Sequence, residues 1–265
     1  MKKILIFMLS LILLAQMSFA ANVTIDGENL EGARLINSVT YVPMRTFAEA
    51  FDEVEVAWNN NTKTATVKQQ EAETGATIGR GYIESRGRVL YSGNENLIID
   101  GSTYIPVRPL AKALGASVTW DNATKTAEVR SGAEKLLSAD EFYNASDLYW
   151  LAKIINAESE GESLTGKLAV GNVVLNRVES PEFPNNVYDV VFDKKGGVQF
   201  TPVANGSIHK EPGWESYLAA KICLESYKVT DKNILFFLNP AISTSTWVPN
   251  NRDFVMSVGN HDFYA

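Results

Sequence analysis

The chain has 265 residues, 45% of them hydrophobic, which is enough for two domains with buried cores. Its formal net charge is −7. Binding of nucleic acid needs clustered Lys and Arg side chains, which so acidic a chain does not offer. The composition therefore argues against a nucleic-acid partner and favours a globular protein with another kind of ligand.

Residues 1–20 predict a secretory signal peptide. Lys2 and Lys3 form a basic start, residues 4–14 are almost entirely apolar, and Ser18 and Ala20 are the small residues that precede a cleavage site. The apolar run is short for a membrane span, and a retained anchor is the alternative. We expect a secreted protein, free of the membrane after cleavage, whose charge is −9 once Lys2 and Lys3 are lost.

Between residues 21 and 131, one unit is written twice. The copies read TYVPMRTFAEAFDEVEVAWNNNTKTATVK from Thr40 and TYIPVRPLAKALGASVTWDNATKTAEVR from Thr103. In each copy, a proline ends a short strand, and a stretch with apolar residues at helical spacing follows. In the first copy this stretch runs from Arg45 to Phe51. An alternating strand, an Asn- or Asp-rich turn and a returning strand complete the copy. Each copy is therefore predicted as strand, helix and hairpin.

This repeat carries no catalytic pattern. The matched Arg45 and Arg108 favour a structural role, pairing with carboxylates or capping carbonyls. The pattern TY[VI]P-x-R…W…TKTA-x-V resembles the copper amine oxidase N-terminal-like domain, a stalk module of secreted bacterial proteins. The family name implies no copper here, because no histidine precedes His209. The resemblance implies a spacer or a module that contacts the cell wall.

Residues 132–146 are polar and acidic and are predicted to be a linker, partly helical. A helix then follows, with Ser146 or Asp147 as the expected N-cap. Its buried face is predicted from helical spacing to include Leu151, Ile154 and Ile155.

The three carboxylates after this run are not equivalent. Glu158 follows Ile154 by four residues and Ile155 by three, so it lies on the apolar side of the helix. Glu160 points to another side of the helix and is expected to be solvated. Glu162 follows the expected helix stop at Gly161. It is expected to cap the next helix or to place a negative charge at its start. Apolar surroundings raise the pKa of a carboxylic acid, as a proton donor to a glycosidic oxygen requires. The alternative is that the helix ends early and Glu158 is merely exposed.

The chain from Leu151 to Tyr264 resembles the catalytic domain of the spore cortex-lytic enzyme and cell wall hydrolase family. The matching stretches are INAESEGES, GKLAVGNVVLNRVESPEFPNNVYDVVF, VQFTPVANGSI, LFFLNP and GNHDFY. The resemblance implies a mostly helical, lysozyme-like domain at residues 147–265 that cuts peptidoglycan glycan strands, with Glu158 as the catalytic acid. Germination-linked members are lytic transglycosylases that leave 1,6-anhydromuramic ends. The whole chain is thus predicted to be α+β, in the cell wall or the spore envelope.

Four further residues are predicted to bind substrate: Gln199, Phe200, Thr201 and Asn239. Gln199 is expected to bond an N-acetyl group or to orient Glu158. Phe200 either stacks on a sugar or packs in the core, and Asn239 either binds sugar or turns the chain. Asn172 and Asn176 either face the site or bond backbone carbonyls, while His261, Trp214 and Tyr217 are expected to be structural.

The residue types limit the other chemistries. Cys223 lies in an apolar helical run, which indicates a core residue, and two histidines are too few for a three-histidine zinc site. No cofactor and no metal are predicted. The alternatives are a muramidase with Glu162 as second carboxylate, a wall-binding protein without activity, and a zinc amidase built on His209, His261 and one carboxylate.

Overall fold

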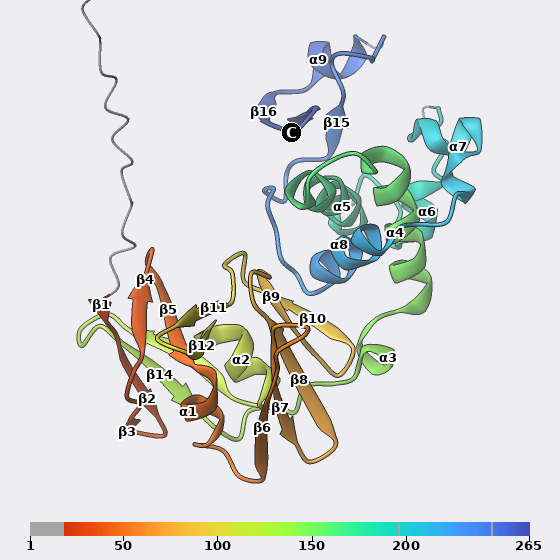
Figure 1. Cartoon of the computed structure of the whole chain (residues 1–265). Helices are drawn as coiled ribbons and strands as arrows, with labels where there is room; N and C mark the ends of the chain where they lie inside the picture. Colours follow the sequence, from red (N-terminus) through yellow and green to blue (C-terminus); the bar gives the residue numbers. More distant parts are fainter. Residues whose placement is uncertain (1–18, 196, 245) are drawn as a thin grey trace, which may run out of the picture.

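The computed structural model describes residues 19–195, 197–244 and 246–265. A β-rich N-terminal domain is followed by a C-terminal domain that is mostly helical, and a short segment with one helical turn joins them (Figure 1). The predicted α+β class is confirmed. The prediction of a signal peptide at residues 1–20 lies almost wholly outside the described residues; Phe19 and Ala20 form β1, which pairs with β4.

The N-terminal domain contains three sheets. Its strands are β1 (Phe19–Ala20), β2 (Asn22–Ile25), β3 (Glu28–Asn29), β4 (Arg34–Ile36), β5 (Val39–Pro43), β6 (Val54–Asn59), β7 (Thr64–Gln69), β8 (Ala72–Thr77), β9 (Tyr82–Ser85), β10 (Arg88–Tyr91), β11 (Leu97–Ile99), β12 (Ser102–Pro106), β13 (Ser117–Asp121) and β14 (Thr126–Arg130). The strand orders are β1-β4-β5-β12-β11, β10-β9-β8-β7-β6 and β13-β14-β2-β3.

The predicted repeat is confirmed and explains this topology. Each copy is a strand, a short helix and a hairpin: β5, α1 (Met44–Ala48) and β6–β7 in the first copy, then β12, α2 (Val107–Ala113) and β13–β14 in the second. The two copies meet where β5 and β12 pair antiparallel. Helix α1 begins one residue before the expected Arg45 and ends at Ala48, because the chain turns back there to begin β6.

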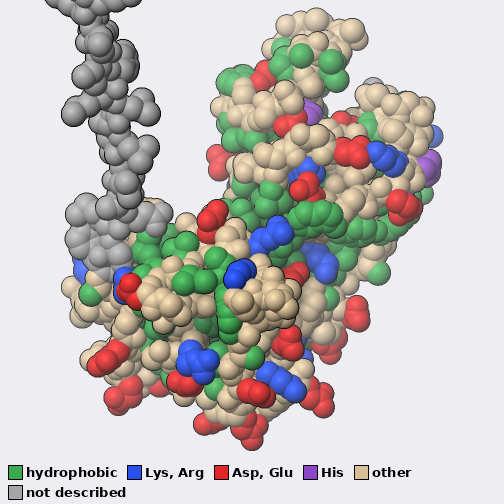
Figure 2. Space-filling model, in the orientation of Figure 1, with side chains coloured by type: hydrophobic (Ala, Val, Ile, Leu, Met, Phe, Trp, Pro, Cys, Tyr) green, Lys and Arg blue, Asp and Glu red, His purple; other side chains and the backbone are tan. Residues whose placement is uncertain are grey.

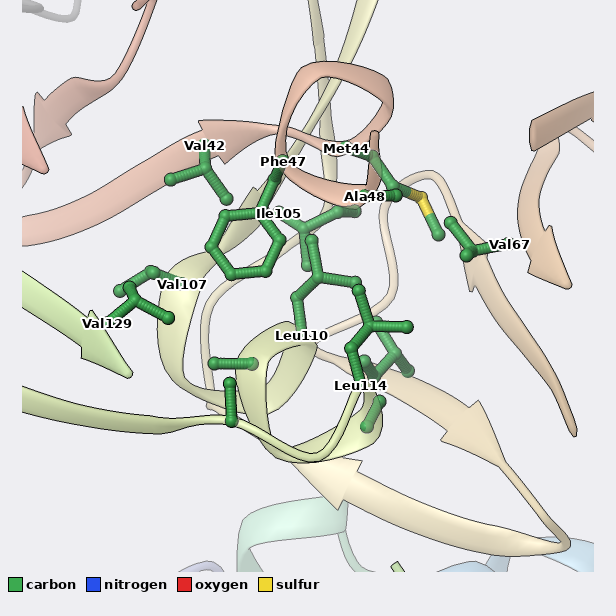
Figure 3. Packing of buried hydrophobic residues seen from close by; sticks show 14 of the residues in the cluster. Val42, Met44, Phe47, Ala48, Val67, Ile105, Val107, Leu110, Leu114 and Val129 are labelled. Carbon is green, nitrogen blue, oxygen red and sulfur yellow. The ribbon is translucent and has the colours of Figure 1, made fainter. Parts of the chain in front are cut away.

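The two repeat helices supply the centre of the N-terminal core. Phe47 of α1 and Leu110 of α2 occupy matching positions in the two copies and are fully buried with Val42 and Ile105 from the paired strands (Figure 3). Burying such a side chain contributes about 1.5–3 kcal/mol. The apolar positions of the repeat are thus explained by packing.

The C-terminal domain surrounds the helix that carries Glu158. Its elements are α4 (Ala145–Ser159), α5 (Leu164–Glu179), α6 (Val187–Val191), α7 (Thr201–Asn205), the 3-10 turn η1 (Ser207–His209), α8 (Trp214–Leu224), β15 (Phe236–Leu238), α9 (Trp247–Asn251), β16 (Phe254–Val258) and β17 (His261–Tyr264). Helices α4, α5 and α8 pack against one another, and β15-β17-β16 form a small sheet.

Helix α4 begins earlier than the sequence pattern predicted. Its N-cap is Asn144, whose side-chain oxygen accepts hydrogen bonds from the backbone N–H groups of Ser146 and Asp147. The expectation that Ser146 or Asp147 caps the helix is therefore wrong. Asparagine caps as well as serine or aspartate does, so composition alone did not separate these candidates.

The segment between the domains is attached to both of them. It contains α3 (Ala139–Phe142), which begins with a capping box between Ser138 and Glu141. The backbone N–H of Ala139 donates to the carbonyl of Arg86, and the next residue after the helix, Tyr143, is buried. The residues predicted as a linker thus include a helical turn docked on the N-terminal domain.

A buried ion pair joins the two domains. The guanidinium of Arg88 in β10 donates two hydrogen bonds, of 2.6 and 2.7 Å, to the carboxylate of Glu225 at the end of α8, and both side chains are only 4% exposed. Glu225 also accepts from Lys112 Nζ at 2.9 Å and from the Tyr143 hydroxyl at 3.0 Å. One carboxylate of the C-terminal domain is therefore bound by both the repeat domain and the connecting segment.

Candidate active site

Glu158 lies in the last full turn of α4, on the side that the apolar spacing predicted. Ile154 and Ile155, four and three residues before it, are fully buried, and Glu158 itself is partly buried. Burial raises the pKa of its carboxyl group from 4.5 to about 7, against the opposing influence of the Arg177 charge. Near neutral pH this side chain therefore exists as both acid and carboxylate, as a group that donates and then accepts a proton requires. The alternative of an early helix end is excluded.

Arg177 is the charged neighbour that sequence reasoning missed. It lies on α5, its Nε donates to the carbonyl of Leu235 at 2.7 Å, and its Cζ is 4.8–5.3 Å from the ring centroids of Phe183, Phe200 and Phe236. Burial lowers the pKa of Arg177 to about 10, and the nearby carboxylates oppose this decrease. The guanidinium therefore stays cationic at neutral pH. The available signal was its helical spacing from Val173 and Val174, which places it on the buried face.

The other two carboxylates are engaged elsewhere. Glu160 is exposed, as expected, and pairs with Lys210 at 2.7 Å. Glu162 is 8% exposed and accepts from Asn260, through the side-chain Nδ2 at 2.7 Å and the backbone N–H at 3.3 Å, while His261 Nδ1 lies 3.8 Å away. Its carboxylate thus holds the β16–β17 turn, whereas Ser163 caps α5.

Gly259 makes this arrangement possible. It has a φ of 59°, and a Cβ at this position would lie 1.9 Å from Glu162 Oε2. Only glycine allows the turn to approach the buried carboxylate so closely. The contact with Asn260 spans 98 residues of sequence and had no local signal.

Three of the predicted substrate-binding residues lie together where the loop after α6 meets α7. The Gln199 side chain donates to the carbonyl of Lys195 at 2.8 Å, within its own loop. Phe200 is 3% exposed and packs against Phe237 and Arg177. Thr201 is exposed at the first position of α7.

The fourth predicted residue, Asn239, lies directly after β15. Its side-chain oxygen accepts from the backbone N–H of Ala241 at 3.0 Å, so it forms a turn, and the side chain remains partly exposed. Because β15 begins with Phe236, which contacts Arg177, this strand lies next to the residues that surround the Arg177 guanidinium.

The two asparagines of α5 bond backbone carbonyls. Asn172 Nδ2 donates to the carbonyl of Tyr227 at 3.0 Å, and Asn176 Nδ2 donates to those of Asp231 and Ile234 at 2.8 and 3.0 Å. Both side chains are buried, so they fasten the chain between α8 and β15.

Cys223 and His261 are buried, in line with the predicted core and structural roles. Trp214, expected to pack, is instead largely exposed beside Arg80. Within the described ranges no cluster of three or more His, Cys, Asp or Glu side chains is placed to hold a metal ion. In the same ranges no helix has the length and apolarity that crossing a membrane would need.

Two family models match the chain. Residues 24–129 match the copper amine oxidase N-terminal domain, and residues 161–264 match Cell Wall Hydrolase. The second match begins three residues after Glu158 and so does not include that residue.

The relatives agree with these matches. The spore cortex-lytic enzyme of Bacillus cereus is 28% identical over 236 residues, covering 74% of this chain and 89% of the relative. That of Bacillus subtilis is 31% identical over 121 residues, covering 46% and 38%. The solved catalytic domain of the germination-specific lytic transglycosylase SleB from Bacillus anthracis is 33% identical, covers 46% of this chain and 97% of that chain, and has a TM-score of 0.42. The chain belongs to the cell wall hydrolase family, as an enzyme whose catalytic domain follows a copper amine oxidase N-terminal-type domain.

Proposed function

We propose that this enzyme is a lytic transglycosylase of peptidoglycan, with Glu158 as its single catalytic acid and base. Protonated Glu158 donates its proton to the glycosidic oxygen as the bond from that oxygen to the muramic C1 breaks. The resulting carboxylate then takes the proton from the C6 hydroxyl of the same sugar, and O6 bonds to C1. No water is added, and Glu158 returns to its acid form with a 1,6-anhydromuramic end as product.

The observation that carries this proposal is the pKa of about 7 that burial confers on Glu158. A group near this value is protonated often enough to act as an acid and gives a carboxylate basic enough to take up a proton. The nucleophile belongs to the substrate, so high effective molarity replaces a positioned water.

A muramidase is less well supported. Glycoside hydrolases of the usual kind need a second carboxylate to act as nucleophile or to activate water. The candidate by sequence, Glu162, is almost fully buried and already accepts hydrogen bonds from Asn260. This engagement leaves Glu162 poorly suited to either role.

Substrate contacts are proposed for Gln199, Thr201 and Asn239, whose side chains are at least partly exposed. The Phe200 ring is buried in the structure, so we propose that it shapes the wall beneath Gln199 and Thr201 and stacks on sugar only after a local rearrangement.

Residues 1–20 are proposed to direct secretion, which places the enzyme at the cell wall or the spore envelope. The names of the relatives support the spore cortex as substrate and germination as the setting. Vegetative wall is the second candidate substrate.

The decisive experiment is mass spectrometry of glycans released from cortex and from vegetative peptidoglycan by the wild type and by Glu158→Gln. We expect anhydromuramic ends from the wild type and a rate at least about 100-fold lower from the variant, the contribution of general acid catalysis. Reducing ends, one water heavier, would favour the muramidase. A variant that retains more than about one tenth of the rate would remove Glu158 from the mechanism, and a wild type that binds glycan without cleaving it would indicate a wall-binding protein.

A further inference from the structure

A cavity of about 800 Å³ lies between the repeat domain and the catalytic domain. Its walls come from the β4–β5 hairpin, from β13 and the start of α2, from the end of β10, and from the residues that follow α8. None of the residues assigned above to catalysis or substrate binding lines it. Figure 2 shows Lys and Arg side chains near the junction of the two domains.

Three aromatic side chains line this cavity: Trp120, Tyr91 and Tyr227. Tyr91 and Tyr227 come from different domains and meet edge to face, with ring centroids 4.6 Å apart. Trp120 lies on the edge strand β13 and is 46% exposed. Beside a cavity, an exposed indole ring offers a flat apolar face on which a ligand ring can stack.

The charges of the cavity are cationic on balance. Its charged lining residues within the described chain are Arg108, Lys112 and Glu225. Glu225 is bound by both Arg88 and Lys112, so Arg108 is the one of the three without an ion pair in the described chain. Arg108 is exposed, and its one hydrogen bond within the described chain is a long contact of 3.4 Å to the carbonyl of Val118. A guanidinium so placed is available to bind a carboxylate.

The first copy of the repeat provides a comparison for these residues. Arg45 and Trp58 are the equivalents of Arg108 and Trp120 and are also exposed, Trp58 by 41%. The partner of Arg45 is Glu49 at 4.0 Å, which differs in kind from the carbonyl partner of Arg108. Both kinds of partner fit a structural arginine, so the cavity, and not the partner, distinguishes the two pairs. Only the second pair opens onto the cavity.

We propose that this cavity is a second glycan-binding site, which takes an uncleaved muramic-acid-containing segment of peptidoglycan. The ring of Trp120 stacks on a sugar face, and Arg108 binds the lactyl carboxylate of a muramic residue that carries no stem peptide. The side chains of Asn94 and Thr119, which also line the cavity, are suited to sugar hydroxyl and N-acetyl groups. The proposal rests on the proposed function, since its ligand is the polymer that the catalytic domain cleaves.

The test uses the full chain carrying Glu158→Gln, so that binding is measured without cleavage. Retention on purified insoluble peptidoglycan is compared for Trp120→Ala, Arg108→Ala and the matched control Trp58→Ala. We expect the first two to weaken binding about tenfold each and the control to match the parent. Trp120→Phe should restore most of the binding, because it keeps an aromatic ring, and thermal unfolding midpoints show that each variant folds.

Two competitors then identify the ligand. Peptide-free oligosaccharides of the glycan strand should displace the parent chain, and free stem peptide should not. Equal binding by Trp120→Ala and its parent would overturn the site, and displacement by stem peptide alone would make it a peptide site instead. A failure of the proposed function looks different, because the Glu158→Gln parent would then release fragments from the peptidoglycan.

Discussion

Replacing Glu158 by Gln should stabilise the protein in a pH-dependent way. The carboxyl group has a pKa of about 7 when folded and 4.5 ordinarily. At about 1.4 kcal/mol for each pH unit, this difference amounts to about 3 kcal/mol. Below pH 4.5 the group is protonated in both states, and the stability tied to the neutral acid is fully present. Between pH 4.5 and about 7 the unfolded chain loses this proton while the folded protein keeps it, so the stability is lost progressively, and above about pH 7 the folded protein holds a buried carboxylate.

The variant has no charge to bury and avoids this loss. The difference in free energy of unfolding between Glu158→Gln and the wild type should therefore increase by about 3 kcal/mol between pH 4 and pH 8.5, in favour of the variant. Urea unfolding at both pH values measures it, with Glu160→Gln as the exposed control. A difference that is the same at both pH values would refute the claim that burial holds Glu158 protonated.

Three other predictions concern contacts far apart in the sequence. Arg177→Met removes the cation that opposes the raised pKa of Glu158, so the alkaline limb of the pH profile of kcat/KM should move to higher pH; an unchanged limb would show that the two charges are not coupled. Glu225→Ala leaves Arg88 buried without its partner, which should lower the free energy of unfolding in urea by about 3–5 kcal/mol. It should also make the connecting segment sensitive to limited proteolysis, and wild-type resistance would contradict the role of this ion pair. Asn176→Ala leaves two carbonyls without their donor and should lower the free energy of unfolding in urea by about 2–5 kcal/mol. The exposed Asn205→Ala should lower it much less, and similar losses for both variants would contradict the structural role of Asn176.

Local patterns accounted for much of the fold. The repeat predicted strand, helix and hairpin twice, because alternation, helical spacing and turn residues each act over a few neighbours. The same kind of pattern placed Glu158 on the apolar side of its helix. The exact ends of elements were less well predicted: Asn144 caps α4, and α1 ends at Ala48, because several residues fit a cap equally well and packing decides among them.

The sequence by itself determined the two-domain organisation, the internal repeat and the unequal character of the three carboxylates. Only the tertiary structure placed Arg177 beside Glu158, tied Glu162 to Asn260 and joined Arg88 to Glu225 across 137 residues. Such contacts depend on how whole helices and sheets pack. No periodicity along the chain encodes them, because the partners lie in elements whose relative positions are set by burial of their apolar faces.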